Sequence, residues 1–181
     1  MQKNWGLMIV AGVMIIVTEC MLLCCRSVAR KVPLNYILLG LFTICEAYIV
    51  SASCSYASLS QPGILIEAGL GTALITLACT IYAFTTKSDF TVMGGAMWIL
   101  AMTLLVLILS TWVFRWNTIL YNSIIALCIF VFGIFLVFDT QLIVGKGKHR
   151  LSLDDYIIAA LILYLDIITI FLYLLELLRD K

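Results

Sequence analysis

Six apolar segments, each long enough to cross a lipid bilayer as a helix, constrain this fold more than any other feature. A helical crossing takes about 20 apolar residues. Hydrophobic residues make up 64% of the 181 residues and charged residues 12%, whereas an average soluble domain has about 45–50% and about 25%. One small core cannot bury that excess, so we predict an all-α, polytopic membrane protein. The expected spans are residues 7–25, 34–56, 64–85, 90–114, 119–144 and 156–178.

The connections between these spans are short, which predicts one membrane domain over residues 1–181 with no soluble domain. The first apolar run is interpreted as a span rather than a removed signal peptide, because no cleavage site with a polar stretch follows it. Ser152, followed by Asp154 and Asp155, predicts a capped helix start with acids in its first turn. A net charge of +1 gives no indication of nucleic-acid binding.

The lysines and arginines of the connections predict the orientation, because cytosolic loops carry an excess of them. Successive connections alternate sides, which places seven basic residues on one side and four on the other. We therefore expect the first group in the cytosol and both termini on the far side. The first group is Arg26, Arg30, Lys31, Lys87, Lys146, Lys148 and Arg150, and the second is Lys3, Arg115, Arg179 and Lys181.

Two aspartates, Asp139 and Asp166, lie inside the last two spans. A charged side chain at the centre of a membrane helix costs roughly 2.5–3.5 kcal/mol on insertion scales, and intramembrane acids usually serve a function. At 1.5 Å per residue, Asp139 lies about 9 Å from Gly145 and Asp166 about 16 Å from Asp155. The short connection makes the two helices antiparallel neighbours, so the carboxyl groups can meet at similar depth.

The last span carries one polar stripe. Ala159, Asp166, Thr169, Tyr173 and Glu176 fall within a narrow sector at about 100° per residue, and the other faces are almost entirely Ile, Leu and Phe. A helix of this kind belongs beside a polar cavity or at the centre of a bundle. The stripe therefore predicts that Asp166 faces the protein interior.

Two adjacent carboxyl groups in a low dielectric cannot both ionise cheaply, so they titrate as a coupled pair. One shared proton would hold Asp139 and Asp166 together near neutral pH, and its loss would leave two repelling charges or a site for Ca²⁺. We therefore predict a pH-sensing, gating pair. The simpler alternative is that each acid only hydrogen-bonds a neighbouring helix.

Three further acids, Glu19, Glu46 and Glu67, lie within or at the edge of apolar segments and are candidates for lining a cation path, because hard cations prefer oxygen ligands. Each could instead be a protonated structural residue. Arg30 is a candidate for locking the aspartate pair from the cytosolic end, although the orientation rule alone also explains its position.

An intramembrane aspartyl protease also needs two acids on neighbouring spans. Such enzymes carry Tyr-Asp on one helix, Gly-x-Gly-Asp on the next and a Pro-Ala-Leu segment. Here the acids lie in Phe-Asp-Thr and Tyr-Leu-Asp, without those glycines and without Pro-Ala-Leu. No Ser-His or Cys-His arrangement suggests another reaction, so we expect no enzyme activity and no cofactor.

The segments FDTQLIVG and HRLSLDDYIIAALILYLDIITIF resemble the signature of the transmembrane Bax inhibitor motif family. CCRSVARKVPLNYILLGLFT and FTTKSDFT resemble its Lifeguard branch. The resemblance implies a seven-helix bundle with the last helix central, in the endoplasmic reticulum, Golgi or plasma membrane. It also implies that the aspartates after Phe138 and Leu165 form the family's pH-sensing pair, and that Arg30 is the arginine that locks it.

The resemblance begins at what corresponds to the family's second span, so the first span has no counterpart in this sequence. Family membership implies a calcium leak that is sensitive to pH and protects cells from apoptosis, with the bilayer and calcium ions as partners. The alternative is a non-conducting adaptor that restrains death signalling by binding other membrane proteins that regulate apoptosis.

Overall fold

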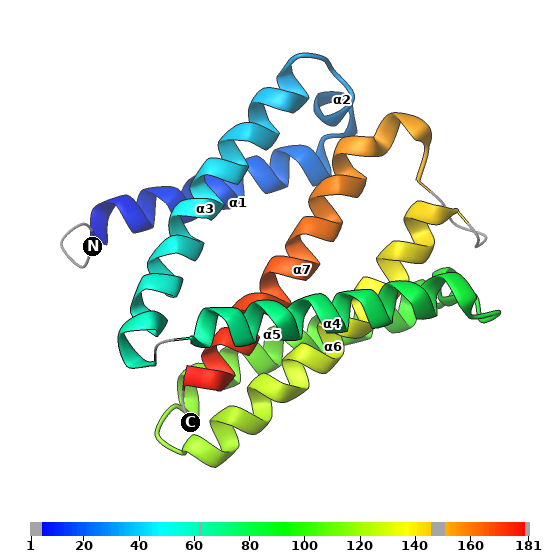
Figure 1. Ribbon diagram of the computed structural model, residues 1–181. Coiled ribbons are helices and arrows are strands. Elements are labelled where there is room, and N and C mark those ends of the chain that lie inside the picture. The colour runs from blue at the N-terminus through cyan, green and yellow to red at the C-terminus, as the bar shows by residue number, and fades with distance from the viewer. Residues whose placement is uncertain (1–4, 62, 146–150, 180–181) are drawn as a thin grey trace.

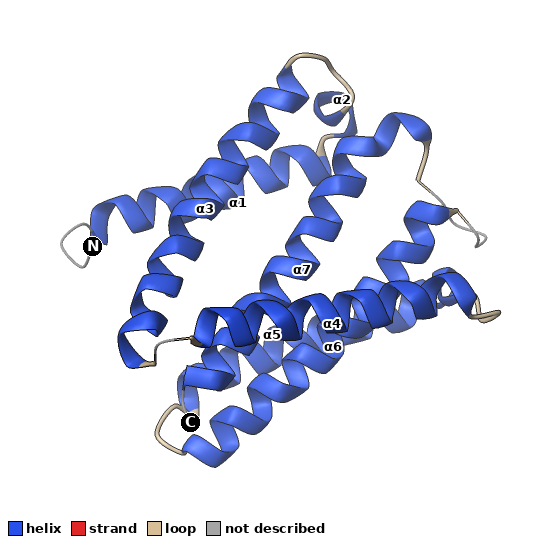
Figure 2. Ribbon diagram, viewed as in Figure 1, coloured by secondary structure: helices blue, strands red, loops and turns tan. Residues whose placement is uncertain are grey.

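The computed structural model describes residues 5–61, 63–145 and 151–179. These residues form seven α-helices and two short 3₁₀ helices, and no strand occurs among them (Figure 2). Six of the α-helices are long and apolar enough to cross a membrane, which confirms the predicted fold class. In chain order the elements are α1 (Trp5–Cys24), α2 (Arg26–Ala29), α3 (Leu34–Ser60), α4 (Ile64–Thr85), η1 (Phe90–Met93), α5 (Gly94–Val113), α6 (Thr118–Val144), η2 (Leu153–Asp155) and α7 (Tyr156–Arg179).

Two of the predicted spans differ from the helices in the structure. Helix α3 continues to Ser60 rather than ending at Tyr56, and its last turn is closed by the Gln61 amide, which donates to the Ala57 carbonyl at 3.4 Å. The fourth span begins as a separate 3₁₀ turn, η1. The side chain of Asp89 caps that turn by accepting from the Thr91 amide at 3.0 Å.

The last helix lies at the centre of the bundle, as expected (Figure 1). Helix α7 packs against α1, α3, α4 and α6, while α5 packs on α6 and η1 from outside. The termini and the α3–α4 and α5–α6 connections share one end of the bundle, which we call the terminal end (Figure 1). The α1–α3, α4–α5 and α6–α7 connections lie at the opposite end, the basic end. Lys146, Lys148 and Arg150, which we expected there, lie outside the described residues.

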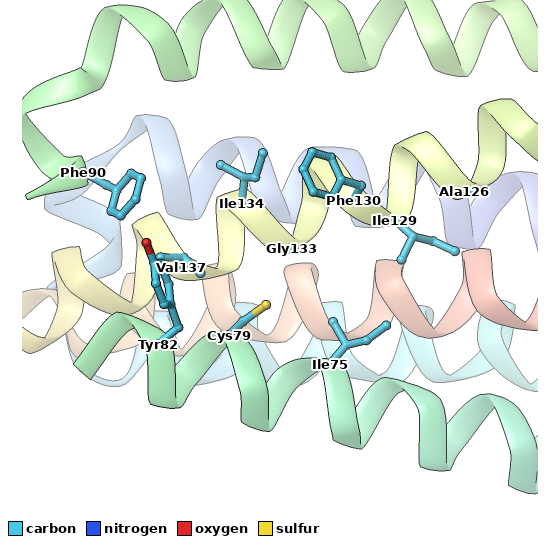
Figure 3. Close-up of a pocket in the computed structure, with 10 residues that line it drawn as sticks. All are labelled: Ile75, Cys79, Tyr82, Phe90, Ala126, Ile129, Phe130, Gly133, Ile134 and Val137. Carbon is cyan, nitrogen blue, oxygen red and sulfur yellow. The ribbon is translucent and has the colours of Figure 1, made fainter. Parts of the chain in front are cut away.

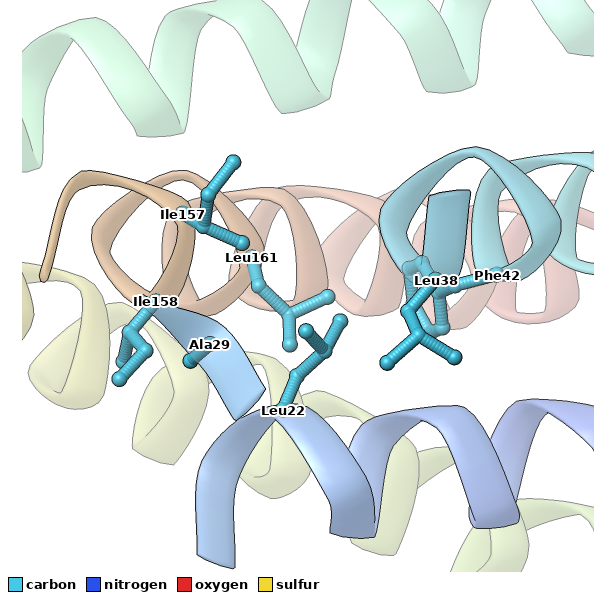
Figure 4. Packing of buried hydrophobic residues seen from close by; sticks show 7 residues of the cluster. All are labelled: Leu22, Ala29, Leu38, Phe42, Ile157, Ile158 and Leu161. Atoms are coloured by element: carbon cyan, nitrogen blue, oxygen red, sulfur yellow. The ribbon is translucent and has the colours of Figure 1, made fainter. Parts of the chain in front are cut away.

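A large buried cluster joins α1, α2 and α3 to the first two turns of α7 (Figure 4). Leu22, Phe42 and Leu161 are fully buried in it. Transmembrane helices associate mainly through such close packing, because lipid chains are as apolar as the side chains themselves. The start of α7 is therefore fixed against the α1–α3 hairpin. The cluster consists of Leu22, Ala29, Leu38, Phe42, Ile157, Ile158 and Leu161.

Other apolar side chains point away from the bundle. Leu74 on α4, Val106 on α5 and Phe130 on α6 are 68%, 61% and 66% exposed, respectively. A surface of this kind in the middle of spanning helices is suited to contact with lipid acyl chains. Inside the bundle, small residues let helices approach closely: a Cβ atom added at Gly71 would lie 3.3 Å from Leu174 Cδ1.

Candidate functional site

Helices α6 and α7 bring Asp139 and Asp166 together. The two side chains belong to residues that are only 8% and 6% exposed. The two carboxyl groups are close enough to interact directly with each other. Because an ionised carboxylate can only accept, a bond between two carboxyl groups requires a proton on one of them. The structure thus places the two acids beside each other, where a hydrogen bond between them would need one shared proton.

The surroundings of the pair supply little else that is polar. Oδ2 of Asp166 is buried, and no amide, hydroxyl or guanidinium donor of the described residues reaches it. On the α5 side, Asp166 is the one acid that lines an otherwise apolar cavity of about 430 Å³ between α5, α6 and α7. Within the described residues, no third His, Cys, Asp or Glu joins the pair to form a cluster that could hold a metal ion. A cation at this site would therefore depend on the two carboxyl groups and on water.

The basic end of α6 is tied to the α4–α5 connection. Gln141, two residues after Asp139, donates from Nε2 to the Ser88 carbonyl at 3.0 Å and accepts from the Phe90 amide at 2.9 Å. Both bonds involve residues of the FTTKSDFT segment. This segment therefore helps to position the helix that carries Asp139.

Arg30 does not reach the aspartate pair and instead holds the start of α7. Its Nε donates to Asp155 Oδ1 at 2.8 Å, and its Nη2 donates to Asp155 Oδ2 at 3.0 Å and to Ser152 Oγ at 3.0 Å. The expected direct lock between Arg30 and the pair is thus absent among the described contacts. Asp155 lies nearer because η2 turns it toward α2, whereas the pair lies in the span, several turns further along α7.

The start of α7 is a capping box, as Ser152 and the acids after it predicted. Ser152 Oγ donates to Asp155 Oδ2 at 2.7 Å, and the Ser152 amide donates to the same oxygen at 3.2 Å. The Arg30 guanidinium, followed by the Ser152 hydroxyl, holds the pKa of the Asp155 carboxyl well below its usual range. Asp155 is therefore ionised at any physiological pH, and this contact does not titrate with the pair.

The remaining candidate acids lie apart from the pair. Glu46 on α3 is 8% exposed, and Glu19 on the neighbouring α1 is close enough to interact with it electrostatically. Glu46 also interacts with Tyr164 of α7. Glu67 is exposed in the first turn of α4. The structure thus groups Glu19 with Glu46 between α1 and α3 and leaves Glu67 separate.

The polar stripe of α7 continues from the pair to the terminal end. Tyr121 on α6 donates its hydroxyl to Glu176 Oε1 at 2.8 Å, and Glu176 also forms a salt bridge with Arg179. The Arg179 guanidinium lies 5.0 Å from the centre of the Tyr56 ring on α3. This group of four side chains joins α3 and α6 to the end of α7.

A second cavity, of about 420 Å³, opens between α4, η1 and α6 and has an almost entirely apolar lining (Figure 3). Gly133 forms part of its wall, and a Cβ atom added there would lie 3.7 Å from Cys79 Sγ. No carboxyl group lines it, so it offers a cation nothing to bind. It belongs to the outer surface of the bundle rather than to the aspartate site.

Several of these contacts were not predicted from sequence. The partners of Arg30 and of Glu176 come from segments far apart in the chain, and no local pattern pairs them. The Ser152–Asp155 spacing did indicate a helix start, but a capping box does not reveal that a third residue, Arg30, binds it from 125 positions away. For Glu176, the polar stripe of α7 was the one sequence feature that indicated an inward-facing side chain.

The comparisons with known proteins agree with this architecture. The family described as "Inhibitor of apoptosis-promoting Bax1" matches residues 1–181. The chain is 36% identical to Protein lifeguard 3 of Homo sapiens over 99% of its own length and 58% of that relative. It is 32% identical to Protein LIFEGUARD 3 of Arabidopsis thaliana over 96% of its length and 69% of that relative.

The chain thus spans less than two thirds of the human relative, and the same 58% holds for Protein lifeguard 3 of Mus musculus, at 32% identity. No solved structure matches it. The family match over the whole chain, with helices that can span a membrane, is decisive for its classification. The chain belongs to the Bax inhibitor motif family, and its relatives there include lifeguard proteins of animals and plants.

Proposed function

We propose that this protein is a pH-sensitive calcium leak that regulates apoptosis from the endoplasmic reticulum, Golgi or plasma membrane, and that Asp139 and Asp166 form its gate. One observation carries the proposal: two acids, each less than 10% exposed, lie beside each other on neighbouring spanning helices. Intramembrane acids are costly and usually mark an ion or proton pathway. The family match is consistent with a regulatory membrane protein rather than an enzyme.

The gate works through the shared proton. While it is present, the hydrogen bond joins α6 to α7 and leaves no net double charge in the bundle. When the proton leaves, two negative charges face each other in a low dielectric, and they either repel or bind a divalent cation through their oxygens. A change in pH is thereby converted into a change in the packing of α6 against α7.

Arg30 has a different part in this proposal from the direct lock that the resemblance implied. Its contact with Asp155 anchors the first turn of α7 to α2. The contact holds the helix that carries Asp166 in position, and Arg30 acts on the pair only through α7.

Calcium flux into proteoliposomes, measured against pH, tests the gate. Wild type should show a flux that depends on pH, and Asp166→Asn should change that dependence because the amide removes one of the two carboxyl groups that share the proton. Asp154→Asn is the matched control, since Asp154 is an exposed acid outside the bundle and should keep the wild-type profile. A flux that is the same for wild type and Asp166→Asn at every pH would exclude the proposed gate.

The alternative, a non-conducting adaptor, makes a different prediction for the same residues. In cells, the double variant Asp139→Asn/Asp166→Asn should lose its protection against apoptosis if protection depends on the leak. Full protection by a double variant that reaches its membrane at normal levels would favour the adaptor. Measuring protein abundance in the membrane fraction separates this result from failure to fold.

A further inference from the structure

A third cavity lies at the terminal end, between α1, α3 and α7, and has a volume of about 670 Å³. It differs from the other two in its chemistry, because six of its twelve lining residues are polar or charged. A cavity holds water when it is roomy and its walls offer hydrogen-bond partners. This cavity meets both conditions. Its polar lining residues are Ser53, Tyr56, Thr169, Tyr173, Glu176 and Arg179.

The inner end of the cavity approaches the aspartate pair. Thr169 lines it and follows Asp166 by three residues, which is less than one turn and about 4.5 Å along the helix axis. The Thr169 hydroxyl makes no hydrogen bond with any described residue and is therefore free to bind water or a cation. Tyr173 and Glu176 continue the same face toward the mouth, so one stripe of α7 connects the mouth to the pair.

The outer end is closed by Arg179. Its guanidinium lies 5.0 Å from the centre of the Tyr56 ring across the cavity, and it forms a salt bridge with Glu176 on its own helix. A positive charge at this point repels cations, while the carboxylate of Glu176 attracts them. Tyr56 contacts Arg179 through a cation–π interaction, which is worth only about 0.5–1 kcal/mol at an exposed site. The salt bridge with Glu176 lies within α7, so the guanidinium can leave the Tyr56 ring while it keeps that partner.

We propose that this cavity is a water-filled vestibule that admits divalent cations to the aspartate pair from the terminal end, with Glu176 as its cation-attracting group and Arg179 as its gate. The role of the vestibule in supplying cations rests on the proposed calcium leak. Its geometry and electrostatics can be tested without any flux. A hydrated cation displaces the guanidinium from Tyr56 and finds hard oxygen ligands on Glu176, Tyr173 and Thr169.

Cysteine accessibility tests whether the vestibule holds water. In full-length protein with its seven native cysteines replaced, Thr169→Cys should react with a membrane-impermeant thiol reagent added at the terminal end. A lipid-facing control, Leu74→Cys, should react at least about tenfold more slowly, because a thiol in apolar surroundings forms little thiolate. Reagent added at the basic end should leave Thr169→Cys unmodified. Equal, lipid-like rates at the two positions would overturn the proposal.

A measurement on the wild-type chain guards against misfolding of the cysteine variants. Hydroxyl radicals generated from water label side chains that contact water. Tyr173, which lines the cavity, should be oxidised, whereas Phe130, which is 66% exposed on the lipid-facing surface, should be spared. Protection of Tyr173 equal to that of Phe130 would show that the cavity is dry and would also overturn the proposal.

The electrostatic part is tested with cationic and anionic thiol reagents of similar size. Glu176 lies seven residues, or roughly 10 Å, from Thr169, so one unit charge there changes each rate about twofold in a medium as polar as water. The two effects act in opposite directions. Glu176→Gln should therefore lower the cationic-to-anionic rate ratio at Thr169→Cys about fourfold at low salt. Arg179 lies further from Thr169, ten residues or roughly 15 Å along the helix, so Arg179→Gln should raise the ratio about 2.5-fold.

The outcomes separate the vestibule from the leak. A wet, cation-preferring cavity in a protein with no calcium flux would retain the vestibule and reject the proposed function. A flux that depends on pH, together with an unlabelled Thr169→Cys and an unlabelled Tyr173, would retain the leak and place its path elsewhere. A rate ratio that neither Glu176→Gln nor Arg179→Gln changes would refute the roles given to these two residues.

Discussion

Replacing each aspartate of the pair with leucine, singly and together, tests whether the two carboxyl groups stabilise one another. Asp139→Leu or Asp166→Leu leaves the remaining carboxyl buried without its partner. Such an orphaned group costs about 1–3 kcal/mol. The double variant leaves no orphan, and replacing both partners with apolar groups of similar shape is often nearly neutral.

The expected magnitude follows from the burial of the pair. Both residues are less than 10% exposed, and Oδ2 of Asp166 has no hydrogen-bond partner among the described residues, so water and neighbouring side chains offer little compensation. Each single variant should therefore lower the free energy of unfolding by about 1–3 kcal/mol, and the double variant by less than either. The resulting interaction energy should equal or exceed the loss in one single variant.

Reversible unfolding in mixed detergent micelles, followed by circular dichroism, measures these four stabilities. Thr140→Val provides a matched control, because Thr140 is buried beside Asp139 but its hydroxyl donates to the Leu136 carbonyl of its own helix at 2.7 Å. Its effect should add to that of Asp166→Leu within about 0.5 kcal/mol. If the stability losses of Asp139→Leu and Asp166→Leu also add within about 0.5 kcal/mol in the double variant, the two carboxyl groups do not stabilise one another and the reasoning fails.

Two further predictions concern other parts of the fold. The stability contributed by Asp155 should be fully present above the ordinary aspartate pKa of about 3.9 and should be lost as the pH falls through its lowered folded-state pKa. Thermal unfolding from about pH 5 to pH 2 should therefore show the difference in stability between wild type and Asp155→Asn becoming smaller. A difference that stays constant would contradict the contact with Arg30. Gly71→Val should destabilise the bundle by about 1–3 kcal/mol, because a Cβ atom there would already lie 3.3 Å from Leu174. Gly69→Val is the control, because a Cβ atom at Gly69 would meet nothing within 4 Å. Equal losses of unfolding free energy in detergent would contradict the close α4–α7 packing.

The helices were predictable because their information is local. An apolar run of about 20 residues has few other stable solutions, since every backbone polar group must be satisfied within the bilayer. Ser152 and Asp155 predicted the start of α7, and the polar stripe through Asp166 predicted which face of α7 points inward. Even so, the structure has an extra turn at the end of α3 and a separate 3₁₀ turn before α5, which the Asp89 side chain caps.

The contacts between distant segments were not predictable in the same way. Several acids lie toward the same end of the bundle as Arg30, and its pairing with Asp155 depends on how α2 and η2 face each other, which no single segment specifies. The same holds for Arg179 and Tyr56, which are 123 positions apart in the chain. Charge alone indicates that a partner exists, and only the packing of the helices decides which one.

In the proposed gate, these contacts together restrict how the bundle can respond to loss of the proton that Asp139 and Asp166 would share. The start of α7 is held by Arg30 and by the buried cluster around Leu161, and its end is held through Glu176. A helix fixed near both ends cannot slide along its axis without breaking all three. Repulsion at its middle is therefore relieved by separating α6 from α7 near Asp139. Removing either anchor should broaden the pH response of the flux, because α7 would then have a second way to move.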